Sequence, residues 1–509
     1  MACAIAVVSF LHPAAARAAW IKAETDRFIV YGDGRDKAVR NLAERLTIFD
    51  ATLRILNPAV GQGVPQRKLE VYLVADGREL RRVEPRLDDR IGGFYRAAPQ
   101  ATFAVVRSSD SVMGADDVLF HEYAHHFMLE NFPAAYPGWF IEGWAEYFMT
   151  AEVTWKGVKV GGYNENRAYW LFHAPWLPLE TVLSKSPSEI EPAKRHIYYG
   201  QAWLLMHYMR GDPARVAQIN KATRAIAAGE PPVKAMQEAT GLTILELTKA
   251  LRGYRRLPML MVKPPMEGPP QVTITPLPAT AEAFLLDNLR LATASVAQPD
   301  AALLADIRTR AARYPGDRLA ELTLARAEFN FGDTAAGEAI AQCRLKEAPG
   351  DVELLYLAGM GQILAAERAP DTHVERLRAA RKLLGKAYAL DQDDYRILLA
   401  YAYSRSAEPA YPTENDLNVL LEARALAPSV QMASVWAGAA LIKRDRRDQA
   451  VGMLSGVANN PHGGPLPAQA RALLAGKSMA EASRIAAAEP DEPGPGEPEK
   501  PPAPAKPAK

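Results

Sequence analysis

The residues best suited to chemistry lie together at positions 120–126, which read Phe-His-Glu-Tyr-Ala-His-His. The spacing of His121 and His125 places both imidazoles one turn apart on the same face of a helix, where both can bind one Zn²⁺ ion. Glu122 then lies beside the water that such an ion binds, in the position of a general base. The segment therefore predicts a helix that carries most of a hydrolytic metal site.

A catalytic zinc site has three protein ligands and one open position for water, so one more ligand is needed. Residues 139–148 (WFIEGWAEYF) are predicted to form a helix that carries Glu142 and Glu146 one turn apart among aromatic side chains. Burying two carboxylates there is costly unless a positive charge holds them. We therefore expect one to bind the metal and the other to orient a ligand histidine through its second ring nitrogen. The alternative interpretation places both on a solvated helix face.

Together these motifs resemble the gluzincin metallopeptidases, the peptidase MA-like group best known from the M1 aminopeptidases. The resemblance covers residues 100–210 and implies an α+β zincin-like catalytic domain. It also implies that Glu142, the Glu before Gly-x-Ala, is the third zinc ligand, and that Glu146 is the carboxylate behind it. The interval between the two motifs is shorter than in M1 enzymes, and no segment for a substrate amino terminus is found. The short bacterial peptidase MA-like proteins are therefore the closer likeness.

The same resemblance implies a tyrosine that donates a hydrogen bond to the tetrahedral oxyanion. The matching segment is 197–205 (IYYGQAWLL), where Tyr199 fits best because Ala202 takes the small position, and Tyr198 is the alternative. A phenol suits this role because it donates without carrying charge. Either tyrosine is alternatively a core residue, since the segment reads as a buried helix. The scheme does not need four other histidines, which are His126, His173, His196 and His207.

The sequence thus predicts a zinc-dependent peptidase with one Zn²⁺ ion and a peptide or protein substrate. Glu122 is the expected general base and Tyr199 the expected oxyanion donor. Residues 102–107 are expected to form an edge strand that pairs with an extended peptide. The rival hypothesis is an exported repeat scaffold that binds partner proteins and carries an inactive or structural zinc-peptidase-like domain.

The catalytic domain is predicted to span residues 20–257. Strand-like runs at 28–31, 69–74, 92–95 and 102–106 alternate with a helical pattern at 37–56, and a helix-rich stretch follows from 116 to 257. Residues 258–279 are dense in proline and are predicted to be a linker. The site would therefore lie where the strand-rich half of this domain meets its helices.

Residues 280–484 contain an internal repeat. Pro315-Gly316-Asp317 recurs as Pro349-Gly350-Asp351, and small residues recur inside the helices between such junctions. This pattern is typical of tetratricopeptide repeats and predicts an all-α solenoid that offers a surface to a protein partner. Helical hairpins without true repeats are the alternative.

Composition limits the remaining possibilities. The 60 Lys and Arg residues balance 59 Asp and Glu, which argues against a nucleic-acid-binding protein. Residues 1–19 resemble a signal peptide, with an apolar run before Ala16-Arg17-Ala18, so export to a bacterial periplasm is expected; a buried strand or helix is the alternative. Beyond this run no apolar stretch is long enough to cross a bilayer. Residues 485–509 are predicted to be a disordered, proline-rich tail.

Overall fold

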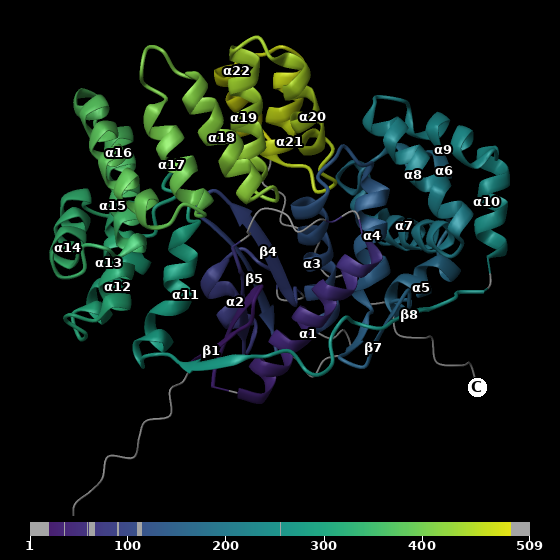
Figure 1. Cartoon of the computed structure of the whole chain (residues 1–509), viewed down its shortest axis with the longest axis horizontal. Helices are drawn as coiled ribbons and strands as arrows, with labels where there is room; N and C mark the ends of the chain where they lie inside the picture. Colours follow the sequence, from purple (N-terminus) through teal and green to yellow (C-terminus); the bar gives the residue numbers. More distant parts are fainter. Residues whose placement is uncertain are drawn as a thin grey trace, which may run out of the picture.

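The structure is a computed structural model of the 509-residue chain, and it describes residues 20–34, 36–58, 60, 67–88, 91–108, 115–254 and 256–489. A mixed α/β region comes first and a helical, solenoid-like region follows it (Figure 1). This order confirms the predicted architecture at that level. The predicted signal peptide lies outside the described residues, as does the tail beyond residue 489.

A six-stranded sheet with the order β4-β5-β3-β2-β1-β9 forms the base of the α/β region. The β2–β3 and β3–β5 pairs are parallel, whereas β4–β5, β1–β2 and β1–β9 are antiparallel. The bounds are β1 (Ile21–Glu24), β2 (Phe28–Gly32), β3 (Leu69–Val74), β4 (Gly93–Ala98), β5 (Ala101–Arg107) and β9 (Thr273–Pro276).

Both faces of this sheet are buried, because strand residues alternate between them. Val30 and Val71 point into a core shared with helices α1, α3 and α4. Tyr72 and Phe103 point the other way, into a core with α2 and with α11, the first helix of the helical region. The sheet therefore joins the helices that carry the site to the start of the helical region.

The strand at residues 102–107 is not an edge strand, so that prediction was wrong. It forms β5, which pairs with β3 on one side and with β4 on the other. The chain turns at Pro99 and Gln100, and β4 therefore becomes the outer strand. An alternating strand pattern does not reveal which of two hairpin strands lies outermost.

Ten α-helices of the α/β region are formed by the residues that the structure describes. A small second sheet, with the order β6-β7-β8, packs beside them. The helices are α1 (Asp36–Leu56), α2 (Gly77–Val83), α3 (Ala115–Asn131), α4 (Gly138–Met149), α5 (Glu165–His173), α6 (Leu179–Ser184), α7 (Arg195–Arg210), α8 (Pro213–Ala227), α9 (Pro232–Thr240) and α10 (Ile244–Gly253), and the strands are β6 (Glu152–Thr154), β7 (Gly157–Val160) and β8 (Leu260–Val262).

The proline-rich segment predicted as a linker takes part in both sheets. β8 pairs with β7, and β9 returns to pair with β1 at the start of the described chain. Short runs such as Leu260–Val262 and Thr273–Pro276 lie between prolines, which hid their strand character in the sequence. This segment therefore joins the α/β region through two short strands, while most of its residues are exposed.

Helices α4 and α7 pack unusually closely, and Gly143 makes this possible. A Cβ atom at Gly143 would lie 2.5 Å from the carbonyl oxygen of Ala202, a distance at which something must move. Both residues belong to the sequence motifs, Gly143 directly after Glu142 and Ala202 three positions after Tyr199. The close contact explains why both positions need small residues, and it fixes the distance between the two motifs.

The helical region contains twelve helices within the described residues. Its repeated Pro-Gly-Asp sequence has a local cause, because Asp317 and Asp351 cap the amino ends of α13 and α15. The helices are α11 (Thr280–Ala292), α12 (Ala301–Ala311), α13 (Arg318–Phe331), α14 (Thr334–Glu347), α15 (Val352–Arg368), α16 (His373–Leu390), α17 (Tyr395–Arg405), α18 (Glu414–Leu426), α19 (Gln431–Lys443), α20 (Arg447–Ala458), α21 (Pro465–Leu474) and α22 (Met479–Ala487).

Small residues set the spacing between neighbouring helices of this region. A Cβ atom at Gly359 of α15 would lie 2.8 Å from Leu384 of α16, and one at Gly438 of α19 would lie 2.7 Å from Leu454 of α20. The small positions noted in the sequence are therefore packing positions. The last helix extends to Ala487, three residues into the predicted tail.

The helical region packs back onto the α/β region (Figure 1). Ser429, before α19, hydrogen-bonds to Glu130 of α3, and the hydroxyl of Tyr395 donates to the carbonyl of Ala98 at 3.1 Å. The far end of the helical region thereby reaches the helices that carry the candidate site. None of the helices formed by the described residues is both long and apolar enough to cross a membrane.

Candidate metal centre

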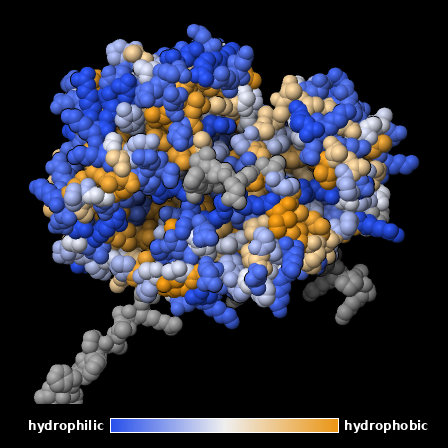
Figure 2. Space-filling view, viewed as in Figure 1, coloured by the Kyte–Doolittle hydropathy of each residue, from blue (hydrophilic) through white to orange (hydrophobic). Residues whose placement is uncertain are grey.

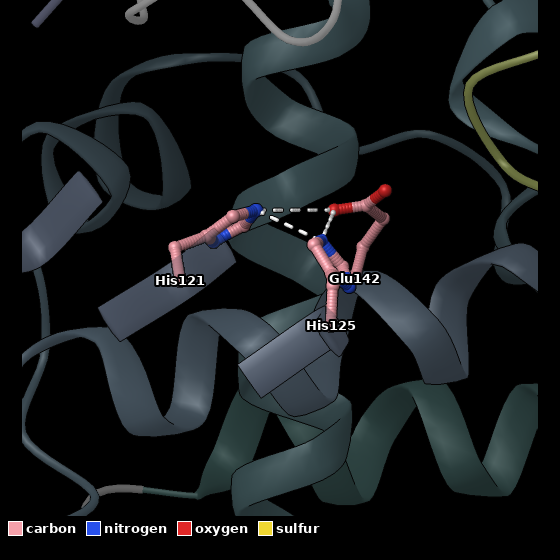
Figure 3. Close-up of side chains that lie close together, drawn as sticks. All are labelled: His121, His125 and Glu142. Atoms are coloured by element: carbon pink, nitrogen blue, oxygen red, sulfur yellow. Dashed lines mark hydrogen bonds and ion pairs between the residues drawn. The ribbon is translucent and has the colours of Figure 1, made fainter. Parts of the chain in front are cut away.

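The site is formed by α3 and α4, which pack against each other. His121 and His125 lie one turn apart on α3, with ring centroids 4.7 Å apart and ring planes nearly perpendicular. Every residue of α4 is buried, as expected for a helix that is apolar on all sides, and Glu142 is therefore carried into the interior. Figure 3 shows the three side chains pointing toward one another.

The three predicted ligands form a compact triangle. The Nε2 atoms of His121 and His125 lie 3.1 Å apart, and Oε2 of Glu142 lies 3.6 Å from the first and 3.4 Å from the second. Zinc bonds of about 2.0–2.2 Å place tetrahedral ligands about 3.3–3.6 Å apart, so two of the three distances lie in this range and the third, between the two imidazoles, is about 0.2 Å shorter. The two imidazole nitrogens and the carboxylate oxygen thus have the chemistry and the spacing that a zinc ion needs.

The burial of Glu142 is a second, independent indication of a cation-binding site. Glu142 is 0% exposed, and neither of its carboxylate oxygens has a hydrogen-bond partner among the described residues. A buried carboxylate without donors is costly, and native proteins avoid it unless a cation completes the site. Within the described residues, these three are the group of potential ligands whose binding atoms all lie within 4.8 Å of one another.

The electrostatics keep Glu142 in the form that binds a metal. Burial alone would raise the pKa of Glu142, but the imidazoles of His462, His125 and His121 hold it well below its usual value. Burial alone would lower the pKa of His121, but the carboxylates around it, with Glu142 the strongest, raise it. Both shifts favour a charged Glu142 beside a protonated His121, a proton that a bound cation would have to displace.

Glu146 lies behind His121, as expected for a carboxylate that orients a ligand. Its Oε1 is 3.7 Å from Nδ1 of His121, on the ring side away from the ligand triangle. Arg167 of α5 holds Glu146 through Nε and Nη2 at 2.7–3.0 Å. Both glutamates are buried beside the histidines, with Glu142 0% and Glu146 1% exposed, which excludes the alternative of a solvated helix face.

Arg167 was missed by the sequence reasoning. Its guanidinium also lies over the ring of Tyr199, 4.5 Å from the ring centroid. Nothing in its neighbourhood in the sequence marks it as part of the site, because α5 lies between a hairpin and α6 without a recognisable motif. The nearest available signal is the need for a positive charge near two buried carboxylates.

The structure separates the two candidate tyrosines of α7. The hydroxyl of Tyr198 donates to the carbonyl oxygen of Lys185 at 2.7 Å, so this donor is already used. Tyr199 lies against Arg167, and burial together with the charge of Glu142 raises its pKa well above the usual value. Tyr199 is therefore a neutral phenol in the electrostatic neighbourhood of the triangle.

Glu122 is half-buried and follows His121 directly on α3. Its negative charge is one of those that raise the pKa of His121, and it also acts on His462. It is therefore near the triangle without belonging to it.

The histidines left out of the predicted site do lie elsewhere: His126 contacts Tyr95, His173 contacts the Tyr169 carbonyl, His196 lies against Trp170, and His207 contacts Tyr254.

His462 is the second residue that the sequence reasoning missed. It belongs to the helical region, yet its Nε2 lies 3.6 Å from Oε1 of Glu142, and its ring packs edge-on against His125 with centroids 5.5 Å apart. More than 300 residues separate it from α3 in the sequence, so local patterns give no indication of the contact.

Comparisons with known proteins add little to this geometry. The chain matches no known family and no curated protein. Among solved structures, it is similar to a thermophilic TPR protein from Thermus thermophilus, with 16% identity over 34% of this chain and 88% of that chain, at a TM-score of 0.29. So distant a likeness carries no functional argument, and the site has to be interpreted from its own residues.

Proposed function

We propose that this protein is a zinc-dependent peptidase of the gluzincin type. The observation that carries the proposal is the triangle of His121, His125 and Glu142, whose carboxylate is completely buried without a hydrogen-bond donor. When bound there, a zinc ion supplies Lewis acidity, which activates water and polarises a scissile carbonyl. The two helices that hold the triangle are the two that carry the motifs shared with gluzincins.

The surrounding residues have distinct roles in this proposal. Glu122, half-buried beside His121, accepts the proton of the attacking water and passes it to the leaving amine. Tyr199 donates its phenolic proton as a hydrogen bond to the oxyanion of the tetrahedral intermediate. Glu146, fixed by the fork of Arg167, holds the ring of His121 in the orientation that presents Nε2 to the metal.

The experiment is to incubate the purified protein with a mixed peptide library, with and without a chelator. We expect cleavage that the chelator removes and zinc restores. Glu122→Gln should abolish cleavage while the protein still binds zinc, and Glu152→Gln, which changes an exposed carboxylate on β6, is the matched control. Cleavage that survives Glu122→Gln would overturn the mechanism.

Tetratricopeptide identity, export and a periplasmic location are further parts of the proposal. The capped Pro-Gly-Asp junctions and the small packing positions of α15 and α19 support a repeat array. Mass determination of the amino terminus of protein recovered from a periplasmic fraction tests export, and a protein found uncut in the cytoplasm would contradict it.

One observation favours the scaffold as a second candidate function. A groove of about 420 Å³ runs along the helical region beside the β4–β5 turn, and its lining includes Tyr356, Met360, Tyr403, Met432 and Trp436. Figure 2 shows apolar surface between the hydrophilic outer faces of these helices. Aromatic and methionine side chains of this kind bind extended segments of partner proteins.

The scaffold hypothesis has its own test. A labelled peptide array probed with Glu122→Gln protein should give binders that Trp436→Ala weakens and Glu152→Gln does not. Binding of this kind, combined with bound zinc and no cleavage of any peptide, would favour the scaffold over the enzyme.

A further inference from the structure

The loop between α20 and α21, residues 459–464, brings the helical region to the metal centre. It carries His462, whose Nε2 lies 3.6 Å from Oε1 of Glu142. The His462 side chain is 31% exposed, whereas the three ligand side chains are almost fully buried. The loop therefore lies at the boundary between solvent and the buried triangle.

Contacts on both sides fix this loop in place. The amide of Ser188, in the α/β region, donates to the carbonyl of Pro461 at 3.3 Å. Within the helical region, Asn460 donates to Gln431 at 2.9 Å and accepts from the amide of His462 at 2.9 Å. The backbone that carries His462 is therefore placed by hydrogen bonds to both regions.

The two oxygens of Glu142 face different groups. Oε2 faces the Nε2 atoms of His121 and His125, whereas Oε1 faces His462. His462 does not belong to the group of residues whose binding atoms all lie within 4.8 Å of one another. Its position is thus behind the ligand carboxylate, as Glu146 is behind His121.

We propose that His462 is a positioning residue of the metal centre, which holds Oε1 of Glu142 so that Oε2 is presented to the metal. The helical region then supplies part of the site, and metal affinity depends on its docking. At 3.6 Å this is a charge contact rather than a hydrogen bond, but a carboxylate with one oxygen placed against an imidazole and the other on the metal has fewer orientations to lose on binding. The inference rests on the proposed function, since it needs a metal at the triangle.

The experiment is a competitive zinc titration against a chromophoric chelator, using the full chain. His462→Phe keeps a ring but removes the nitrogen, and His462→Gln keeps an N–H donor near the position of Nε2. We expect His462→Phe to weaken zinc binding about 10- to 100-fold, the usual effect of losing a group behind a ligand, and His462→Gln to restore most of the affinity. His373→Phe, at a half-buried histidine that starts α16, is the matched control.

Each other outcome has a defined meaning. If wild-type protein binds zinc and all three variants bind it equally well, His462 does not position Glu142 and the inference is wrong, although the zinc site stands. If wild-type protein and His121→Ala are equally unable to bind zinc, the proposed function itself fails. Higher peptidase activity in His462→Phe at unchanged zinc affinity would instead identify the loop as a cover, and would also overturn the inference. Melting curves in chelator show whether each variant is folded.

Discussion

The α/β region and the helical region each bury a carboxylate completely, and they surround it in opposite ways. In the helical region, Asp394 is 0% exposed and is held by Arg396 at 2.7 Å and by Arg67, from the α/β region, at 2.9 Å. In the α/β region, Glu142 is equally buried and accepts no hydrogen bond from the described residues.

The contrast distinguishes a buried charge whose hydrogen bonds the chain supplies from one whose hydrogen bonds it does not supply. The arginines beside Asp394 compensate the cost of its burial from within the chain, and they outweigh that burial to lower its pKa. Around Glu142 the nearest groups are imidazoles at 3.4–3.6 Å, which are themselves metal ligands by type. The pKa is lowered at both carboxylates, so the difference lies in the hydrogen bonds: Asp394 accepts several, whereas Glu142 accepts none from the described residues, and the proposed zinc ion would complete its coordination.

The largest effect should follow from neutralising Glu142. Glu142→Gln keeps the shape of the side chain but removes a charged ligand, so we expect zinc affinity to fall at least about 1000-fold. In chelator the variant should lose less free energy of unfolding than Asp394→Asn does, because only imidazoles at 3.4–3.6 Å, and no hydrogen-bond donor, lose a charged neighbour. Zinc titration and melting curves with and without chelator measure both quantities. Strong destabilisation of the metal-free variant would show that Glu142 has a structural role like that of Asp394.

Asp394→Asn should behave in the opposite way. The substitution retains the cap of α17, and Arg396 keeps Glu353 at 2.9 Å, but both arginines lose a buried charged partner, so we expect a loss of about 1.5–3 kcal/mol in the free energy of unfolding. Zinc affinity should change little, and chemical denaturation in chelator measures the loss. A loss below about 1 kcal/mol would mean that the buried pair contributes no more than an exposed one.

Whether a residue of the site can be predicted from the sequence depends on how far along the chain it lies from the residues it contacts. His121, His125 and Glu142 were found because the motifs lie on two consecutive helices, where spacing determines which side chains share a face. Gly143 and Ala202 were likewise visible as small residues. Arg167 and His462 could not be predicted as site residues, because their contacts depend on how distant segments pack together. The zincin-like fold itself remains a prediction from resemblance.

The order of the strands in the sheet could not be predicted from the sequence for a related reason. The apolar run at residues 102–106 predicted the strand correctly, but its place inside the sheet follows from the pairing of β4 on its outer side. The repeat junctions were easier to predict, because a cap such as Asp317 acts within its own turn of chain. Features that depend on neighbouring residues, such as helix caps, could therefore be predicted from the sequence, whereas pairing between distant strands could not.

Glu130 of α3, at the boundary between the two regions, is a third buried carboxylate that can be compared with Glu142 and Asp394. Burial raises its pKa to about 7, against the hydrogen bonds from Ser429, which lower it. The unfolded chain loses this proton near pH 4.5, so Glu130 should destabilise the fold progressively from pH 4.5 to 7 and by a constant amount above pH 7.

Glu130→Gln should remove that dependence. We expect a gain of up to about 3 kcal/mol at pH 8 and almost none near pH 4.5, seen as a flatter profile of unfolding free energy between these values. Denaturation of both proteins across this range measures it. Parallel profiles for wild type and variant would show that Glu130 titrates normally in the folded protein.

The smallest effect is expected for Arg167→Lys, which keeps the charge beside Glu146 but loses the two-nitrogen fork. We expect about 10-fold weaker zinc binding, because Glu146 then holds His121 less firmly. Arg215→Lys, at another arginine that lies over a tyrosine ring, is the control. Equal zinc affinities in the two variants would mean that the fork contributes nothing to the orientation of His121.

The pairing of β1 with β9 also has a consequence for how the chain folds. The first described strand cannot complete its hydrogen bonds until residues 273–276 have been synthesised, and the second face of the sheet waits for α11 after them. Such pairing gives the α/β region a high contact order, and we expect it to fold more slowly than the locally connected helices that follow. On a ribosome, the amino-terminal half would therefore finish folding only after the next region has begun to emerge.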